Sequence, residues 1–244
     1  MNGIYRIADK NIEICSIYSD VHTLCSDYRY EGEPDFTVEI LQRDIEFERE
    51  RSAAEDRAQG HDVIEYSDGY LETLAVYRKI ADRMLDYRTI LFHGSCVAVD
   101  GVGYLFTAKS GTGKSTHTRL WREYFGDRAV MINDDKPLIR ISDEGATIYG
   151  TPWMGKHGLG MNASVPLSAV CVLERDSENR IVRVEKKSIY PMLLQQTHRP
   201  GGAADMAKKL RIIDDLAARV GLYRLGCNMN IEAASVAYEG MVRK

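Results

Sequence analysis

The sequence predicts an α/β (or α+β) fold with a mixed-sheet core, and three observations support this. A strand-like run, a glycine-rich segment and a helix-like run follow one another between residues 102 and 125. Short β-rich runs fill the beginning of the chain, and helical periodicity dominates its last third. These changes divide the 244 residues into a β-rich N-terminal part, residues 1–88, and a core with C-terminal helices, residues 89–244.

The N-terminal part begins with short strands and ends in a helix. A highly charged run at 43–62 is expected to be a solvated linker or an exposed edge. Residues 62–70 are expected to add a strand and an Asp68-Gly69 turn, before an amphipathic helix at 70–87. Three runs rich in β-branched and aromatic residues predict the strands: 4–8, 12–18 and 36–42.

The core part opens with a hairpin. Asp100-Gly101 predicts a tight turn between strands at 95–99 and 104–108. A helix with an apolar face of Leu120, Trp121, Tyr124 and Phe125 should follow, with Gly126 as its C-cap. Further strands are expected at 129–135, 137–141, 147–150, 167–175 and 222–227, and helices at 189–197, 203–220 and 231–242.

The segment between the hairpin and this helix follows the phosphate-loop pattern G-x-x-x-x-G-K-[ST], except that Ala108 replaces the first glycine. A methyl group fits at that strand exit if φ is negative there. Such loops bind phosphate through backbone N–H groups at a helix N-terminus, while the lysine neutralises phosphate and the hydroxyl ligates Mg²⁺. The residues expected to bind ATP are Ser110, Gly111, Thr112, Gly113, Lys114, Ser115 and Thr116.

An acidic pair at a strand end supplies the other half of such a site. Asp134 and Asp135 follow the apolar run "AVMIN", and paired carboxylates repel unless a cation or proton lies between them. One aspartate is expected to hold Mg²⁺, together with Ser115, and the other to accept the proton of an attacking hydroxyl. The sequence does not say which does which, and Asn-Asp-Asp is also good turn chemistry.

His93 is a third candidate, because it ends a strand expected to lie beside the loop strand. A lone histidine is more often structural than catalytic. His93, Lys114, Asp134 and Asp135 together form the expected catalytic group.

These residues resemble the catalytic core of HPr kinase/phosphorylase, and also the nucleotide-binding core of ATP-dependent phosphoenolpyruvate carboxykinase. The shared elements are His93-Gly94, a hairpin, the S-G-x-G-K-S loop and the Asp134-Asp135 pair, between Leu91 and Leu138. The resemblance implies a mixed-sheet phosphate-loop core and transfer of a phosphate from ATP to a hydroxyl, with Mg²⁺ bound at the acidic cluster.

The chain departs from both families outside this region. The C-terminal signature of HPr kinase and the full metal and oxaloacetate-binding set of the carboxykinase are missing. In size and layout the chain is similar to short kinases of this superfamily that phosphorylate a serine of a lasso peptide. That likeness implies a peptide, protein or small-metabolite hydroxyl as acceptor.

Two glycine-rich segments are candidates for binding the acceptor. In "TPWMGKHGLGMN", Trp153 could form an apolar wall, Lys156 could contact phosphate or a carboxylate, and Asn162 ends the segment. In "THRPGGAAD", Arg199 could clamp phosphate on loop closure. The alternative for both is a plain connector.

Composition limits the other classes of function. A net charge of −4 disfavours a dedicated nucleic-acid binder. No apolar run is long enough to span a membrane and no signal peptide is recognisable, so a cytoplasmic protein is expected. The five cysteines lack a C-x-x-C pair, which predicts reduced, mostly buried thiols and no zinc site.

Three functions remain open at this stage. The first is a Mg²⁺- and ATP-dependent kinase acting on a hydroxyl. The second is a catalytically silent nucleotide-binding regulatory module, for which the Ala108 departure is the only hint. The third is a carboxykinase-type lyase.

Overall fold

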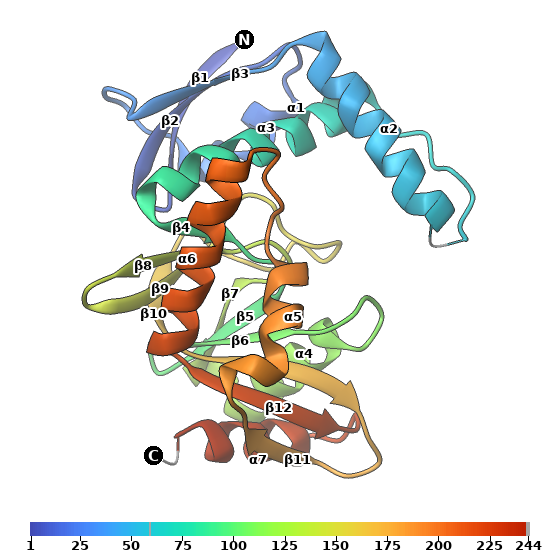
Figure 1. Ribbon diagram of the computed structural model, residues 1–244, viewed down its shortest axis with the longest axis vertical. Helices are drawn as coiled ribbons and strands as arrows, with labels where there is room; N and C mark the ends of the chain where they lie inside the picture. The colour runs from blue at the N-terminus through green and yellow to red at the C-terminus, as the bar shows by residue number, and fades with distance from the viewer. Residues whose placement is uncertain (59, 243–244) are drawn as a thin grey trace. The chain divides into compact units, whose positions relative to one another are not determined.

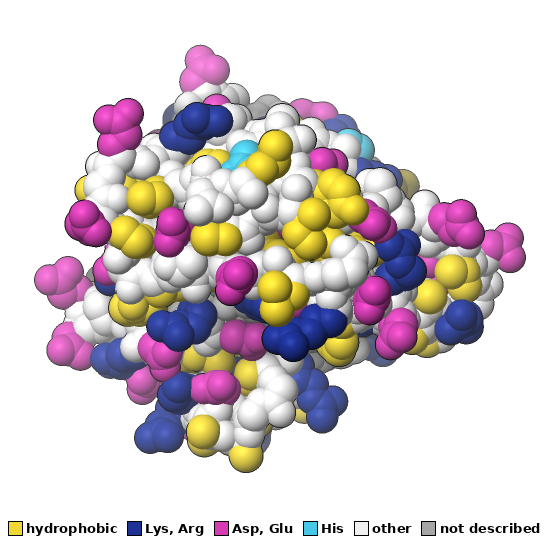
Figure 2. All heavy atoms as spheres, turned by 90° about the horizontal axis from the view of Figure 1, so that it is seen from above, with side chains coloured by type: hydrophobic (Ala, Val, Ile, Leu, Met, Phe, Trp, Pro, Cys, Tyr) yellow, Lys and Arg dark blue, Asp and Glu magenta, His cyan; other side chains and the backbone are white. Residues whose placement is uncertain are grey.

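The computed structural model describes residues 1–58 and 60–242 and divides into two compact units, Met1–Arg83 and Met84–Lys244 (Figure 1). Gln59, in the charged run, and the last two residues of the expected core lie outside the described residues. No helix among the described residues is long and apolar enough to cross a membrane. On the face shown in Figure 2, acidic and basic side chains are interspersed with apolar ones.

The N-terminal unit contains a three-stranded sheet in the order β1-β2-β3, and all three expected strands are present. β1 (Asn2–Ile7) and β2 (Lys10–Cys15) are antiparallel. β3 (Phe36–Glu39) runs parallel to β2, because the short helices α1 (Asp20–Leu24) and η1 (Ser26–Tyr28) carry the chain back between them.

The charged run was expected to be a linker or an exposed edge, but it forms the helix α2 (Gln42–Ala58). Its charges are paired on two sides. Arg51 and Glu55 pair one turn apart at 3.0 Å, while the buried Glu48 pairs with Arg78 of α3 (Asp68–Met84). A run of Glu, Arg and Ala also has high intrinsic helix propensity.

The expected strand at 62–70 is also absent from the structure. The Ser67 hydroxyl accepts a hydrogen bond from the Tyr70 N–H at 3.2 Å, as an N-cap does. Asp68 and Gly69 therefore lie in the first turn of α3 rather than in a β-turn. The helix predicted at 70–87 is confirmed, two residues earlier at its start.

The C-terminal unit is built on a nine-stranded mixed sheet, which confirms the predicted fold class. Its main path is β4-β8-β9-β10-β6-β5-β7, with β12 paired to β10 and β11 paired to β12. The strands are β4 (Thr89–Leu91), β5 (Ser95–Val99), β6 (Val102–Thr107), β7 (Ala129–Asn133), β8 (Leu138–Ser142), β9 (Gly145–Tyr149), β10 (Ser164–Arg175), β11 (Arg180–Arg183) and β12 (Gly221–Cys227).

Strand direction gathers several strand ends at one edge of this sheet. β6, β10 and β12 are mutually parallel, so Thr107, Arg175 and Cys227 end on the same side. β5 is antiparallel to both β6 and β7, which brings the end of β7 to that side as well. In open α/β sheets, ligands bind at the carboxyl ends of strands.

Helices cover both faces of the sheet (Figure 1). α4 (Lys114–Phe125) and α7 (Glu232–Val242) contribute to one apolar cluster, with Trp121 fully buried in it. α5 (Lys186–Gln196) and α6 (Ala203–Arg219) contribute to the other. The buried face of α4 differs from the prediction, since His117 is inside and Tyr124 is 48% exposed.

Candidate functional site

The glycine-rich segment forms a loop between the end of β6 and the start of α4. Gly111 (φ +73°) and Gly113 (φ +121°) adopt backbone conformations that side chains disfavour. Gly113 is the N-cap of α4, and no side chain among the described residues caps this helix end. The first backbone N–H groups of α4 therefore point at the loop without a capping partner, as in anion sites at helix N-termini.

Ala108 departs from the usual loop pattern, but it fits its position. The residue is fully buried in the apolar cluster beneath α4, and its φ is negative. Its methyl group packs into the core and leaves the turn at Gly111 and Gly113 unchanged. The alanine therefore gives no structural reason to consider the loop inactive.

Lys114 begins α4 and turns back over the loop. Its Nζ lies 3.5 Å from the carbonyl oxygen of Ala108. Burial lowers the pKa of the Lys114 ammonium, while the negative charge of Asp135 acts in the opposite direction. The Thr107 hydroxyl, at the end of β6, donates a hydrogen bond to the His93 carbonyl at 3.0 Å, so the loop begins beside His93.

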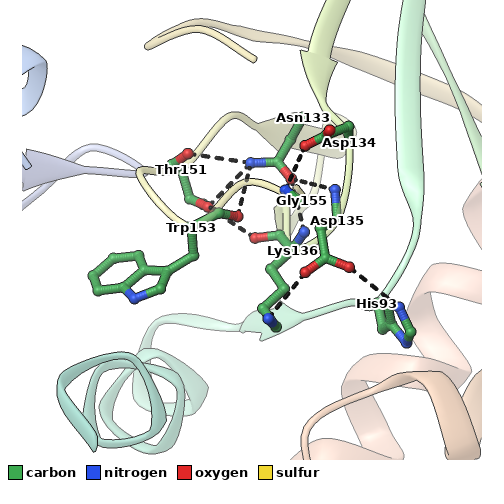
Figure 3. Close-up of polar contacts among 8 residues, drawn as sticks. All are labelled: His93, Asn133, Asp134, Asp135, Lys136, Thr151, Trp153 and Gly155. Carbon is green, nitrogen blue, oxygen red and sulfur yellow. Dashed lines mark hydrogen bonds and ion pairs between the residues drawn. The ribbon is translucent and has the colours of Figure 1, made fainter. Parts of the chain in front are cut away.

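A buried asparagine organises the acidic pair, as Figure 3 shows. The Oδ1 atom of Asn133 accepts hydrogen bonds from the N–H groups of Asp135 (2.9 Å) and Lys136 (2.7 Å). Its Nδ2 donates to the Thr151 hydroxyl and carbonyl and to the Trp153 carbonyl. Asn133 therefore holds the turn after β7 against the segment that begins at Thr151.

The two aspartates point in different directions from this turn (Figure 3). Asp134 is 6% exposed and accepts a hydrogen bond from the Gly155 N–H at 2.6 Å. Asp135 contacts His93 Nε2 at 3.2 Å and Lys136 Nζ at 2.9 Å. The backbone adds a further link, because the Gly94 N–H donates to the Asp135 carbonyl at 2.9 Å.

These contacts set the charge of Asp135. Burial alone would raise the pKa of this carboxyl, but the hydrogen bond with His93 and the charge of Lys136 outweigh it and lower the pKa to about 2. Asp135 is therefore a carboxylate at any pH near neutrality, in contact with His93 and Lys136.

The candidate acceptor residues are distributed unevenly. His93 was expected to end a strand, but it lies between β4 and β5, and β5 is the strand beside β6. Arg199 follows a segment that pairs with this connection, since the His93 N–H donates to the Gln196 carbonyl at 2.6 Å. Arg199 is exposed and lines a cavity of about 450 Å³. Lys156 and Asn162 are exposed, whereas the Trp153 side chain is buried and does not form an open wall.

Two further residues, Asn133 and Arg175, also shape the site. The sequence "NDD" predicts only a turn at Asn133, although an amide at the end of an apolar strand, directly before two aspartates, is a usable signal. Arg175, at the end of β10, donates a hydrogen bond to the carbonyl of Gly111 and so holds the loop. No local signal in "VLER" marks that contact, because it joins residues 64 positions apart.

The residues at this edge fit a magnesium ion bound together with phosphate. No group of three or more His, Cys, Asp or Glu side chains in the described parts of the chain is placed to hold a metal by itself. The exposed Ser115 hydroxyl and the carboxylates of Asp134 and Asp135 offer hard oxygen ligands of the kind that Mg²⁺ prefers. Phosphate oxygens would have to complete the coordination, as is usual for Mg²⁺.

The thiols fit the expectation from the sequence. All five cysteines are free, and Cys25, Cys96 and Cys171 are buried.

Comparison with known proteins shows distant similarity to solved structures. No family model matches this chain, and no curated protein matches it. Among solved structures, the Hpr(Ser) kinase/phosphatase from Coxiella burnetii is similar over 61% of this chain and 94% of that chain, with a TM-score of 0.34 and 10% sequence identity. Because a TM-score that low supports no further inference, we infer function from the geometry of the site.

Proposed function

We propose that this protein is a Mg²⁺-dependent kinase that transfers the γ-phosphate of ATP, or of a similar nucleoside triphosphate, to a hydroxyl. The observation that carries the proposal is the convergence of an uncapped phosphate-type loop, Lys114, and the Asp135–His93 pair at one edge of the sheet. Each part can occur alone in a structural role. Together they are the parts that phosphoryl transfer requires, namely positioning and charge stabilisation.

The binding roles follow from the chemistry of each group. Backbone N–H groups from Ser110 to Thr116 would hold the phosphates, and Lys114 would neutralise the β- and γ-oxygens. Ser115 and an aspartate would hold Mg²⁺. When bound, the ion offsets the charge that develops on the transferred phosphate.

The geometry favours different roles for the two aspartates. Asp135 contacts His93 and Lys136, whereas Asp134 accepts a hydrogen bond from the Gly155 N–H. We assign Asp135 to the reacting side, where its carboxylate accepts a hydrogen bond from the acceptor hydroxyl. The hydroxyl oxygen bonds to the γ-phosphorus as the bond from phosphorus to the leaving diphosphate breaks, and the proton passes to the Asp135–His93 pair.

A carboxylate with a pKa of about 2 is a weak base, which suits this reaction. In a loose phosphoryl-transfer transition state the hydroxyl loses its proton late, so orientation matters more than basicity. His93 shares the proton through its contact with Asp135. Asp134 would then support the turn and contribute to the metal site.

Calorimetry tests the nucleotide site directly. Lys114→Ala should weaken ATP binding at least tenfold while leaving thermal unfolding nearly unchanged, because the ammonium lies at the loop and not in the core. Lys187→Ala, which removes an exposed lysine on α5 outside the loop, is the matched control. Unchanged ATP affinity in Lys114→Ala would rule out the phosphate-loop assignment.

Transfer itself is tested with labelled ATP and a panel of peptides and metabolites that carry hydroxyls. Asp135→Asn should bind ATP and transfer phosphate on the order of 10²-fold more slowly. If the unmodified protein binds ATP but labels no acceptor, the silent regulatory module is the better account. A requirement for oxaloacetate would favour the carboxykinase.

A further inference from the structure

The strand ends at the site lie in a fixed order, and the nucleotide loop is in the middle. Across the sheet the order is β7-β5-β6-β10-β12, and the loop leaves from β6. The acidic pair follows β7, two strands away on one side. On the other side are the ends of β10 and β12. The loop therefore has an acidic flank and a second flank with different chemistry.

That second flank contains a cavity of about 550 Å³. Gly111, Thr112 and Gly113 of the loop form one of its sides. Its other walls come from the first turns of α4 and from the ends of β10 and β12, with Leu120, Leu173 and Met229 as apolar surfaces. Volume and lining are those of pockets that bind small organic ligands.

The cavity wall includes a buried histidine with an unused hydrogen-bonding group. His117 is 2% exposed, and its Nε2 accepts a hydrogen bond from Trp121 Nε1 at 3.0 Å. An indole N–H can only donate, so Nε2 of His117 carries no proton and the ring must carry its proton on Nδ1. This Nδ1 has no partner among the described residues.

A buried donor without a partner has lost its hydrogen bonds to water and gained none in return, which favours an acceptor atom at this position. The lining combines this donor with apolar walls and with the polar groups of Thr116 and Asn228. A nucleoside has the matching features, a flat heteroaromatic ring with ring-nitrogen acceptors and a polar ribose.

We infer that this cavity binds the nucleoside part of the phosphate donor, with the triphosphate running across the loop toward Asp135. The inference rests on the proposed function. It adds the direction in which the nucleotide lies and the residues that contact its base. The acidic pair follows β7, on the opposite side of the loop from this cavity, so the γ-phosphate end lies on the acidic flank and the nucleoside leaves the loop on the β10–β12 flank. His117 Nδ1–H donates to an acceptor atom of the base or ribose, after a small opening of the wall.

A thiol in the cavity wall provides the test. Cys227 lines the cavity and is half-buried, while Cys15, in the N-terminal unit, is also half-buried and serves as an internal control. Methyl methanethiosulfonate labelling of each thiol is followed by mass spectrometry. The protein is free, saturated with Mg²⁺-ATP, or saturated with Mg²⁺-tripolyphosphate, which fills the phosphate loop and has no nucleoside.

ATP should slow labelling of Cys227 at least tenfold, and tripolyphosphate should slow it less than twofold. Cys15 should react at one rate in all three samples. If ATP and tripolyphosphate protect Cys227 equally, or if ATP does not protect it, the nucleoside lies elsewhere.

A variant separates this inference from the proposed function. Cys227→Trp fills the cavity, so ATP affinity should fall at least tenfold while tripolyphosphate affinity stays within twofold, which also shows that the variant is folded. If both ligands bind the unmodified protein equally tightly, only the nucleoside site is refuted. If neither binds, or Lys114→Ala changes neither affinity, the proposed function fails and this inference fails with it.

Discussion

His117 makes the stability of the C-terminal unit depend on pH in a calculable way. Burial lowers its pKa from 6.5 to about 4. Between these pH values the histidine is protonated in the unfolded chain but neutral in the folded protein. Stability is therefore full above pH 6.5 and is lost as pH falls toward 4. One pKa unit corresponds to about 1.4 kcal/mol, which gives a loss of about 2 kcal/mol by pH 5 and about 3 kcal/mol by pH 4.

Urea unfolding of the unmodified protein and of His117→Gln at pH 7 and pH 5 measures this loss. Glutamine keeps an acceptor for the Trp121 indole and cannot titrate. Both tryptophans, Trp121 and Trp153, lie in the C-terminal unit, so their fluorescence follows that unit. His157→Gln, at an exposed histidine, controls for the loss of any imidazole.

The stability advantage of the unmodified protein over His117→Gln should shrink by about 2 kcal/mol between pH 7 and pH 5. The His157→Gln difference should stay constant. An advantage that changes by less than about 0.5 kcal/mol, near the error of such extrapolations, would refute the neutral, buried histidine and the hydrogen-bond argument built on it.

Three further outcomes are expected. Gly150→Ala should abolish the cooperative fluorescence transition in urea, because a Cβ there would lie 1.9 Å from the Met161 carbonyl oxygen. Burial, together with the charge of Arg199, lowers the pKa of Lys209 from 10.5 to about 8. The stability of the unmodified protein relative to Lys209→Met, measured by urea unfolding, should therefore rise between pH 8 and pH 10.5. Asp135→Asn should reduce the phosphate-transfer rate by on the order of 10²-fold and change ATP affinity little, by radiolabel transfer and calorimetry.

The parts of the fold that the sequence predicts well are those with local causes. Asp100 (φ +51°) and Gly101 (φ +79°) both adopt the left-handed conformation of a two-residue hairpin turn, as the Asp-Gly pair predicted. Gly111 and Gly113 also have positive φ angles, in the phosphate-type loop. In these cases the residue type follows from a backbone angle that few other residues adopt.

The incorrect predictions arise where contacts with distant residues determine the secondary structure. A run of alternating charges is compatible with solvent or with a helix, and α2 is a helix partly because Glu48 and Asp44 meet Arg78 and Lys79 of α3. Those partners lie about 30 residues further along the chain. Charge pattern alone did not reveal them.

The candidate site shows the same division between local and distant causes. The loop, the acidic pair and His93 are recognisable in the sequence because each follows or precedes a strand. The different orientations of Asp134 and Asp135 are not recognisable in the sequence, because consecutive side chains point in different directions after a strand end. Their partners in the structure show the two directions: Asp134 contacts the Gly155 N–H, and Asp135 contacts His93.

The order of strand ends also bears on the acceptor. If the nucleoside occupies the β10–β12 flank, the hydroxyl must approach in line from the opposite flank, where Asp135 and His93 lie. The segment that runs to Arg199 is hydrogen-bonded to His93 on that flank, whereas the buried Trp153 ring offers no open surface. Of the two glycine-rich segments, we therefore expect the one with Arg199 to bind the acceptor, and the one with Trp153 to hold the acidic turn in place through Asn133.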